Sequence, residues 1–522
     1  MSDFITATDL KSALHDGNEI ALLDVREHGQ YGESHLFYAT SLPYSRLERD
    51  VHRLVPRKRV RLVVCDDDGA DNGVAARAAR RLEALGYTHV RVLKGGTRAW
   101  RDAGYKLFAG VNLPSKTFGE LVEHAYHTPR IAPRELADRL ASGQRIMIFD
   151  GRPESEFRKM SIPGAVCCPN GELAYRIKRL VPDDTTPIVI NCAGRTRSII
   201  GAQTLINLGI PNPVYALENG TQGWYLNDLA LEHGRTDRYG EDTGNSILRP
   251  QAEALAKRFN VPFVSADQVT KWACDPDRTL FLCDVRSPAE FRAGTLPGAQ
   301  HTPGGQLIQA FDQYIGVRRA RIVLFDSDGV RAPVVASWLR QMNHEACVLN
   351  GGLSSGLAIE AAAGAVPAPL DAITVDQLAR RLARKDAAVV DLRSSMQYRA
   401  GHIPGARWSI RPRLARDLQG ESRQVVLVAD DVQIAQWAAT ELPHPALLLE
   451  GGMPAWQAAG HGLEASPDRP CDADCIDYLF FVHDRHDGNK EAARQYLAWE
   501  TGLVDEIDAL ERAEFLLPQP GA

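Results

Sequence analysis

The feature that most constrains the fold is an internal repeat, because each of its copies is expected to fold in the same way. Four segments consist of an apolar run that ends in Asp, with Arg two residues later. They are ALLDVREHGQY, IFDGRPESEF, FLCDVRSPAEF and VVDLRSSMQY, with aspartates at Asp24, Asp150, Asp284 and Asp391. The last three continue into SIPGA, TLPGA and HIPGA, which are turn signals because Pro fixes one backbone dihedral angle and Gly permits another.

The four copies also end alike, with VLKGGTRAW, ALENGTQGW, VLNGGLSSG and LLEGGMPAW. Between the two landmarks lies a second apolar run followed by an amphipathic helical pattern, for example RLVVC and then VAARAARRLEALGY. Strands that alternate with helices at this density predict an α/β domain with a parallel central sheet covered on both faces.

The repeat divides the chain into four domains and a tail. The polar stretches between the first three units are expected to carry one helix each, and the tail ends in the helical pattern LVDEIDALERAEF. The chain therefore resembles two double modules in tandem. The predicted domains are residues 1–109, 129–230, 263–363 and 371–463, followed by a helical tail over 464–522.

Charge and composition exclude several classes of protein. The formal net charge of -6 argues against a general binder of nucleic acids or anionic membranes. No apolar run approaches the roughly 20 residues that cross a bilayer, and the first residues do not read as a secretory signal. Nine cysteines in 522 residues are too sparse for a disulfide framework. We expect a cytoplasmic protein without a nucleic-acid or membrane partner.

One cysteine stands between a strand pattern and a helix pattern, in PIVINCAGRTRSII. A loop that leads from a parallel strand into a helix directs several backbone N–H groups into one concavity, at the positive end of the helix dipole. Such surroundings lower the pKa of a thiol from ~8.5 by a unit or more, which favours thiolate. We expect Gly194 to permit a tight bend. The expected catalytic residue is Cys192, and the expected cradle is Ala193, Gly194, Arg195, Thr196, Arg197 and Ser198.

The other units lack a suitable cysteine at the loop. The third has Asp326 and the fourth has Ala429 after the corresponding strand. In the first unit either Cys65 or Asp66 can occupy this position, and the loop CDDDGADN is longer and acidic, which disfavours a thiolate. We therefore expect only the second unit to be active.

These motifs together resemble the rhodanese family of sulfurtransferases. The resemblance covers all four units and is weakest in the first, where SHLFYATSLP replaces the Pro-Gly-Ala turn. It implies doubly wound domains whose active-site loop follows the central strand. It also implies that Cys192 takes a sulfane sulfur from thiosulfate or a related persulfide donor and passes it to cyanide or a thiol, which can be a protein thiol, through a persulfide. No cofactor is implied.

Two other functions stay open. Rhodanese-like phosphatases and arsenate reductases share the fold but place Arg six residues after the cysteine, where this chain has Ser198, and Arg197 falls one residue short. The three units without a suitable cysteine also permit a regulatory binding scaffold. The resemblance also implies a donor preference: relatives that use mercaptopyruvate carry an uncharged loop, so Arg195 and Arg197 favour the doubly charged thiosulfate.

Two recurring residues are expected to support the fold. Asp150 and Arg152 belong to the Asp-x-Arg pattern of all four units, so we interpret them as a structural ion pair rather than as catalytic groups. Trp224, in the closing motif, is expected in the core.

A second thiol is a further hypothesis. In the rhodanese arrangement the run PGAVCCPNGEL crosses near the mouth of the active loop, so Cys167 or Cys168 can approach Cys192. Side chains alternate in direction along a strand, so only one of the two cysteines can face the site. The alternative is that both cysteines simply fill space beside Val166.

The tail contains a group of potential metal ligands. The seven-residue spacer before the first histidine is short for a zinc finger, and IDYLFFV is typical of a packed helix face, so we expect packing and no metal. The residues are Cys471, Cys475, His483 and His486.

Overall fold

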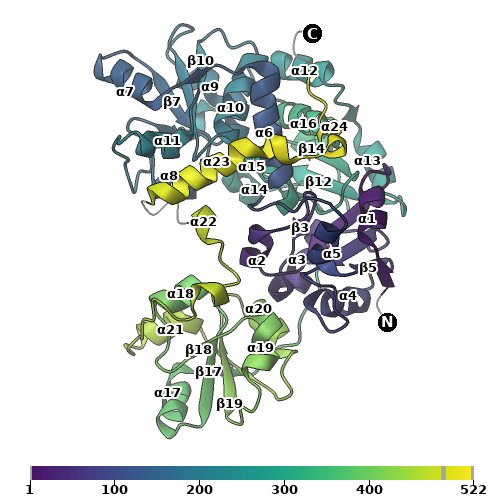
Figure 1. The fold of residues 1–522 in the computed structure, drawn as a ribbon. Coiled ribbons are helices and arrows are strands. Elements are labelled where there is room, and N and C mark those ends of the chain that lie inside the picture. The colour runs from purple at the N-terminus through teal and green to yellow at the C-terminus, as the bar shows by residue number, and fades with distance from the viewer. Residues whose placement is uncertain (1–2, 484–488, 519–522) are drawn as a thin grey trace. The chain divides into compact units, whose positions relative to one another are not determined.

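The computed structural model describes residues 3–483 and 489–518 and contains four five-stranded sheets alternating with helices (Figure 1). Within each sheet the strands pair in parallel and follow one order, which is β1-β5-β4-β2-β3 in the first. The central strands are β4, β9, β14 and β19. The predicted α/β fold with four tandem domains, each built on a parallel central sheet, is confirmed.

The first two domains have the same succession of elements. The first consists of β1 (Asp3–Ile5), α1 (Ala7–Leu14), β2 (Ile20–Asp24), α2 (His28–Glu33), β3 (Thr40–Ser41), α3 (Leu47–Leu54), β4 (Arg61–Cys65), α4 (Val74–Ala84), β5 (Val90–Leu93) and α5 (Gly96–Asp102). The second consists of β6 (Arg130–Ile131), α7 (Pro133–Ala141), β7 (Met147–Asp150), α8 (Glu154–Lys159), β8 (Val166–Cys167), α9 (Asn170–Leu180), β9 (Ile188–Asn191), α10 (Thr196–Asn207), β10 (Val214–Leu217) and α11 (Gly220–Leu226).

The last two domains repeat this succession. The third consists of β11 (Phe263–Val264), α13 (Ala266–Ala273), β12 (Leu280–Asp284), α14 (Pro288–Ala293), β13 (Gln300–His301), α15 (Gly304–Gln309), β14 (Arg321–Phe325), α16 (Arg331–Gln341) and β15 (Glu345–Leu349). The fourth consists of β16 (Ala372–Ile373), α17 (Val375–Arg384), β17 (Ala387–Asp391), α18 (Ser395–Ala400), β18 (Arg407–Trp408), α19 (Arg411–Asp417), β19 (Gln424–Val428), α20 (Val432–Ala439), β20 (Leu447–Leu449) and α21 (Gly452–Ala458).

Helices also form in the linkers and the tail, as predicted. The linker before the second domain contains α6 (Leu113–Tyr126), and the linker before the third contains α12 (Arg249–Arg258). The tail contains α22 (Phe480–His483), α23 (Lys490–Glu506) and α24 (Ala509–Ala513). Among the helices of the described ranges, none is long and apolar enough to cross a membrane.

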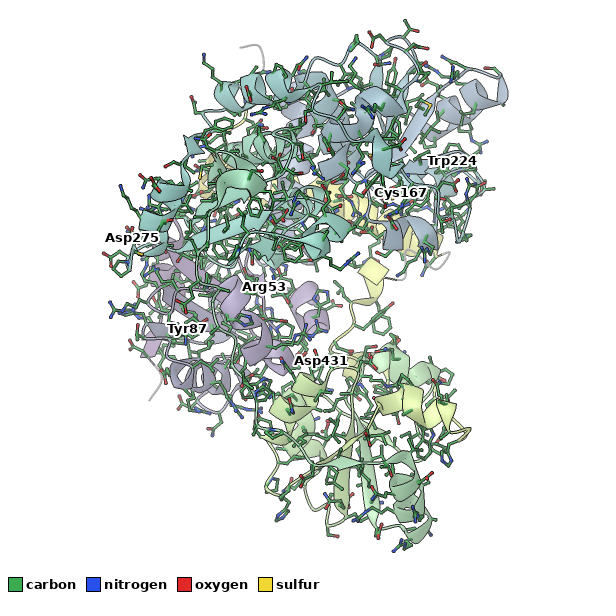
Figure 2. The ribbon with its side chains drawn as sticks, turned by 180° about the vertical axis from the view of Figure 1, so that it is seen from behind. Arg53, Tyr87, Cys167, Trp224, Asp275 and Asp431 are labelled. Atoms are coloured by element: carbon green, nitrogen blue, oxygen red, sulfur yellow. The ribbon has the colours of Figure 1, made fainter. Side chains whose placement is uncertain are left out.

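Alternating strand residues build the cores. In the fourth domain Val389 and Val426 belong to one apolar cluster, whereas Val390 and Leu427 belong to another. Side chains of adjacent strand residues point to opposite faces, so the apolar runs cover both faces of the sheet. In the second domain Cys167 on β8 and Trp224 on α11 share one cluster (Figure 2), which places Trp224 in the core as predicted.

The pairing of the domains differs from the tandem pairing that we predicted. One compact unit contains the first and fourth domains, and the other contains the second and third domains with α6, α12, α23 and α24; the stretch Ser12–Ala21 also belongs to the second unit. In the first unit, Arg411 Nη2 donates to Glu48 Oε1 at 2.8 Å in a buried pair. In the second unit, Gly171 of α9 and Gly305 of α15 let two helix starts approach closely. Such complementary surfaces decide the pairing, and the order of the repeats does not reveal them.

Candidate active site

A shared backbone hydrogen bond fixes the register of the four loops. The residue after the aspartate of each Asp-x-Arg motif donates its N–H to the carbonyl of the last residue of the central strand, as Gly151 does to Asn191 at 2.8 Å. The equivalent donors and acceptors are Val25 and Cys65, Val285 and Phe325, and Leu392 and Val428. The residues that open the four loops are therefore Asp66, Cys192, Asp326 and Ala429.

This register decides between the two candidates of the first unit. Cys65 is the last residue of β4, and burial raises the pKa of its thiol well above the ordinary value. Asp66 occupies the loop, where its carboxylate oxygens accept N–H bonds from Gly69 at 2.7 Å and Ala75 at 2.8 Å. The first unit therefore has a carboxylate where the second has a thiol.

In the third unit, backbone N–H groups of the loop hold a carboxylate that belongs to the loop itself. Asp326 Oδ1 accepts the N–H of Gly329 at 2.8 Å, and Asp326 Oδ2 accepts the N–H of Ala332 at 2.7 Å. These donors lie three and six residues after the residue that opens the loop. In the second unit the same two positions belong to Arg195 and Ser198. The backbone of the third loop therefore directs N–H groups toward a negative charge at the position that opens the loop.

The first turn of α11 holds the Cys192 loop from behind. The N–H of Thr221 donates to Cys192 O at 2.8 Å, and the N–H of Gln222 donates to Ala193 O at 3.1 Å. Gly220 has φ +53°, and a Cβ atom there would lie 2.2 Å from Cys192 O, so only glycine fits. The closing motif is not among the residues predicted for the site, although a glycine with positive φ recurs in it at Gly96, Gly352 and Gly452.

Cys192 is almost fully buried, with 2 % of its surface exposed, and an arginine lies near it. Arg197 Nη1 and Nη2 donate to the two carboxylate oxygens of Glu156, each at 2.8 Å. Burial opposes the charge of Arg197, but Glu156 and then Cys192 raise its pKa. The guanidinium is therefore within electrostatic reach of the Cys192 thiol.

We did not predict the role of Glu156, but the repeat contains a signal for it. The third unit has the same pair, in which Arg331 Nη2 donates to Glu290 Oε1 at 2.7 Å. In the other two units, which lack the loop arginine, the position of Glu156 holds Gln30 or Gln397. A carboxylate is present only where the loop carries the arginine.

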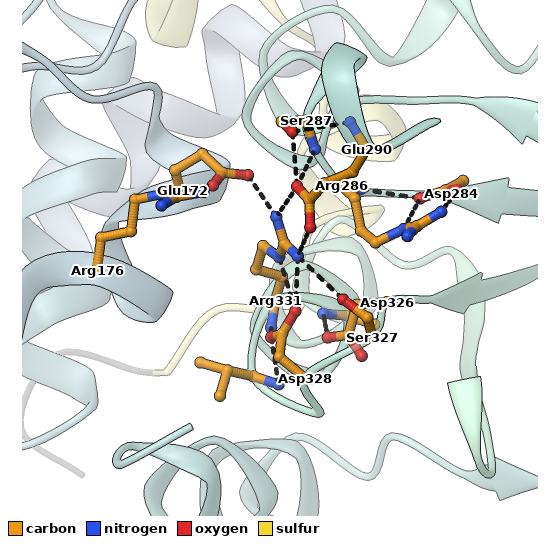
Figure 3. Close-up of polar contacts among 12 residues, drawn as sticks. Glu172, Arg176, Asp284, Arg286, Ser287, Glu290, Asp326, Ser327, Asp328 and Arg331 are labelled. Atoms are coloured by element: carbon orange, nitrogen blue, oxygen red, sulfur yellow. Dashed lines mark hydrogen bonds and ion pairs between the residues drawn. The ribbon is translucent and has the colours of Figure 1, made fainter. Parts of the chain in front are cut away.

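The second and third domains also contact each other through these arginines. Arg331 Nη1 donates to Glu172 Oε1 of α9 at 2.8 Å (Figure 3), and Arg197 Nη1 reaches Gln306 Oε1 of α15 at 3.5 Å. Each loop is therefore tied to the helix that begins after the third strand of the other domain.

The other loop arginine is occupied by carboxylates of the linker helix α6. Arg195 Nε and Nη2 donate to Glu120 at 2.8 Å, Nη2 also contacts Glu123, and Nη1 donates to Asn219 Oδ1 at 3.3 Å. The residue is only 8 % exposed. Protein acceptors thus occupy most of its N–H groups, and two nearby carboxyl groups offset its charge before any substrate arrives.

Gly194 serves the loop in a way that we did not predict. It is absent from the glycines with left-handed φ, so the bend itself does not require glycine. A Cβ atom at Gly194 would instead lie 2.8 Å from Glu500 Oε2. The residue is small because a helix of the tail packs against the loop.

The Asp-x-Arg motif forms a buried ion pair. Arg152 Nε and Nη2 donate to Asp150 at 2.8 and 2.7 Å, and Nη2 also donates to Met160 O at 2.7 Å. Asn191 Nδ2 donates to the same carboxylate at 2.7 Å. The corresponding pair recurs in every domain, between Arg26 and Asp24, Arg286 and Asp284, and Arg393 and Asp391.

The two neighbouring cysteines of the second domain are both buried. Cys167 Sγ donates to Arg152 O at 3.4 Å, and burial raises its pKa to about 12. Burial also raises the pKa of Cys168 well above its ordinary value. Both side chains are therefore thiols and not thiolates near neutral pH, and their approach to Cys192 stays a prediction.

One of the potential metal ligands of the tail, His486, lies outside the described residues, in the gap between the two described ranges. Cys471 is exposed and its Sγ donates to Asp474 Oδ2 at 3.2 Å, whereas Cys475 is buried. Within the described ranges no group of three or more His, Cys, Asp or Glu side chains is arranged to hold a metal ion.

This chain is similar to several known proteins. A crystal structure titled as a thiosulfate sulfurtransferase from Pseudomonas aeruginosa is 40% identical, with a TM-score of 0.91 over 99% of this chain and 100% of that one. A candidate thiosulfate sulfurtransferase of Mycobacterium tuberculosis, SseB, is 28% identical over 32% of this chain and 71% of its own length.

A third relative matches over a single domain. It is an HTH-type transcriptional regulator of Mycobacterium tuberculosis, 37% identical over 19% of this chain, and the match spans about half, 47%, of its length. The rhodanese-like domain family itself matches four times, over residues 6–103, 132–227, 265–358 and 374–459. The chain therefore belongs to the rhodanese-like domain family, with four copies of the domain.

Proposed function

We propose that the protein is a sulfurtransferase in which Cys192 carries the transferred sulfur as a persulfide. The Cys192 thiolate attacks the outer sulfur of thiosulfate, a new S–S bond forms, and the S–S bond of thiosulfate breaks so that sulfite leaves with its electron pair. A nucleophile such as cyanide then attacks the outer sulfur of the persulfide, giving thiocyanate and restoring the thiolate. Charge and atoms balance in both steps without a cofactor.

The observation that carries this proposal is the anion in the third loop. There a carboxylate of Asp326 is held by the backbone N–H groups of Gly329 and Ala332. The equivalent donors in the second unit, Arg195 and Ser198, would hold the negative sulfur of a Cys192 persulfide. Arg197 lies within electrostatic reach of the same sulfur. The similarity to a thiosulfate sulfurtransferase over the whole chain supports the same reaction.

The test is a sulfur-transfer assay with thiosulfate, mercaptopyruvate and glutathione persulfide side by side, with cyanide or a thiol as acceptor. We expect turnover, and mass spectrometry of the donor-treated protein should show one added sulfur atom on the peptide that contains Cys192. Absence of that adduct with every donor would contradict the proposal and favour a binding scaffold.

The two loop arginines are expected to differ in their effect on the donor. Arg197→Ala should lower kcat/KM for thiosulfate by about tenfold to a hundredfold, the value of ~1.5 to 3 kcal/mol for a charge-assisted contact. It should lower kcat/KM less for a persulfide donor, whose reacting group carries a single negative charge. Arg195→Ala should lower kcat/KM equally for both donors, because Glu120 and Glu123 already neutralise Arg195. Equal losses for both donors in Arg197→Ala would show that Arg197 only shapes the loop.

A second thiol is proposed as a secondary feature of the same site. If Cys167 or Cys168 reaches Cys192, mild peroxide should produce a disulfide between them that peptide mapping detects. A Cys167→Ser and Cys168→Ser double variant with full turnover and unchanged peroxide sensitivity would exclude the idea.

A further inference from the structure

The second and third loops share a backbone plan, but the space beside them differs. Beside the third loop lies a cavity of about 350 Å³. The loop, the start of α12 and the end of β15 line it. Its lining includes Arg249, Glu253, Asp326, Asp328, Gly329 and Gly352.

Backbone hydrogen bonds identify the same place in the second domain. The N–H of Val348 donates to Pro262 O at 2.9 Å in the third domain, and the N–H of Ala216 donates to Pro129 O at 2.8 Å in the second. The helix that precedes this bond is α12 in one case and α6 in the other. Counting back from the bond, Lys116 and Glu120 of α6 correspond to Arg249 and Glu253 of α12.

In the second domain this place is filled by α23 of the tail. This helix packs against α6 and α11, and Figure 1 shows it crossing α6. Tyr496 and Glu500 lie one helical turn apart on its buried face. A Cβ atom added to Gly194 would lie 2.8 Å from Glu500 Oε2 and 3.3 Å from Tyr496 Cε1. The third loop has a cavity where the Cys192 loop has these two side chains.

Glu500 links three elements of the site. Its Oε1 accepts from Lys116 Nζ at 2.7 Å and from Thr196 Oγ1 at 2.8 Å, and Lys116 Nζ also donates to Tyr496 Oη at 2.7 Å. Glu500 is fully buried, and its Oε2 has no hydrogen-bond partner among the described residues. Burial opposes ionisation, but Lys116 and then Thr196 lower the pKa of Glu500, so the carboxylate is charged.

We propose that Glu500 is a positioning residue of the Cys192 site and that α23 is part of this site rather than a peripheral tail. Thr196 is the first residue of α10 and lies between Arg195 and Ser198, the positions whose N–H groups hold the Asp326 carboxylate in the third loop. Glu500 accepts a hydrogen bond from Thr196 and packs on Gly194, so it fixes the Cys192 loop. It does so on the side where the third loop has a cavity. The inference rests on the proposed function, but the thiol chemistry that tests it does not require turnover.

The test compares three variants of the full chain. Glu500→Ala removes both hydrogen bonds and the contact with Gly194, whereas Glu500→Gln keeps an oxygen that accepts from Thr196 and Lys116. The matched control is Glu491→Ala, on the same helix, where the side chain is 82% exposed. Each variant is measured for kcat and KM, for the pH profile of Cys192 alkylation, and for Tm.

We expect Glu500→Ala to lower kcat at least tenfold and to shift the alkylation profile of Cys192 at temperatures well below its Tm. Glu500→Gln should recover most of kcat, and Glu491→Ala should match the wild type. If Glu500→Ala lowers only Tm and keeps the kcat and alkylation profile of the control, the proposal is overturned and α23 is merely structural.

Should Glu500→Ala not fold, Glu500→Asp provides the same test, because its shorter side chain keeps the charge and withdraws the carboxylate from Thr196 and Gly194. A slower kcat with an unchanged Tm supports the proposal, and a kcat equal to that of the control contradicts it. Loss of activity in Cys192→Ser tests the proposed function separately, so the two failures are distinguishable.

Discussion

Replacing Cys192 with serine should abolish sulfur transfer, with a loss of at least about a thousandfold, the scale seen when a covalent nucleophile is removed. A serine hydroxyl is not ionised near neutral pH and cannot form a persulfide. The loop should keep its shape, because Thr221 and Gln222 hold the backbone carbonyls of Cys192 and Ala193 and not the sulfur. Thiocyanate formation from thiosulfate and cyanide measures the effect, and an unchanged Tm shows that the fold persists.

Cys65→Ser is the matched control. Cys65 is also a buried cysteine at the end of a central strand, but it precedes the loop and its pKa is raised by burial. We expect this variant to retain the wild-type kcat. Sulfur transfer that survives in Cys192→Ser and disappears in Cys65→Ser would transfer the catalytic role to the first unit.

Local patterns were sufficient to predict the fold and the position of the loop. Apolar runs of four to five residues that end in Asp became the strands β2, β7, β12 and β17, and the amphipathic runs became the helices between them. The prediction works because strand and helix periodicities and Pro-Gly turns are properties of a few neighbouring residues. The Cys192 loop was identifiable for the same reason, since it lies between two such patterns.

Charge partners could not be predicted in this way. The sequence shows that Arg195 and Arg197 are basic, but it does not show that Glu120 and Glu156 neutralise them. In the same way, Lys116 and Glu500 are 384 residues apart in the chain and meet through tertiary packing alone. Periodicity describes a single element, whereas these contacts depend on which elements the fold brings together. The pairing of the domains was mispredicted for the same reason.

The largest expected effect on stability belongs to the buried pair of the Asp-x-Arg motif. Arg152→Met should lower the free energy of unfolding of its unit by about 3 to 5 kcal/mol, because it leaves the Asp150 carboxylate buried without its cation. Met160 O also loses its donor. Methionine retains much of the side-chain length, so the loss reports mainly the charge and the hydrogen bonds. Chemical denaturation followed by circular dichroism and by activity measures the change.

The repeat supplies the control that separates a structural role from a catalytic one. Arg393 makes the same bonds with Asp391 in the fourth domain, whose loop opens with Ala429 in place of a cysteine. Arg393→Met should therefore destabilise its own unit by a similar amount and leave kcat unchanged. If the motif is structural in both domains, folded Arg152→Met should also keep most of its kcat under conditions well below its unfolding midpoint. A kcat loss of a hundredfold or more in folded Arg152→Met, with none in Arg393→Met, would show that Arg152 takes part in the chemistry of Cys192.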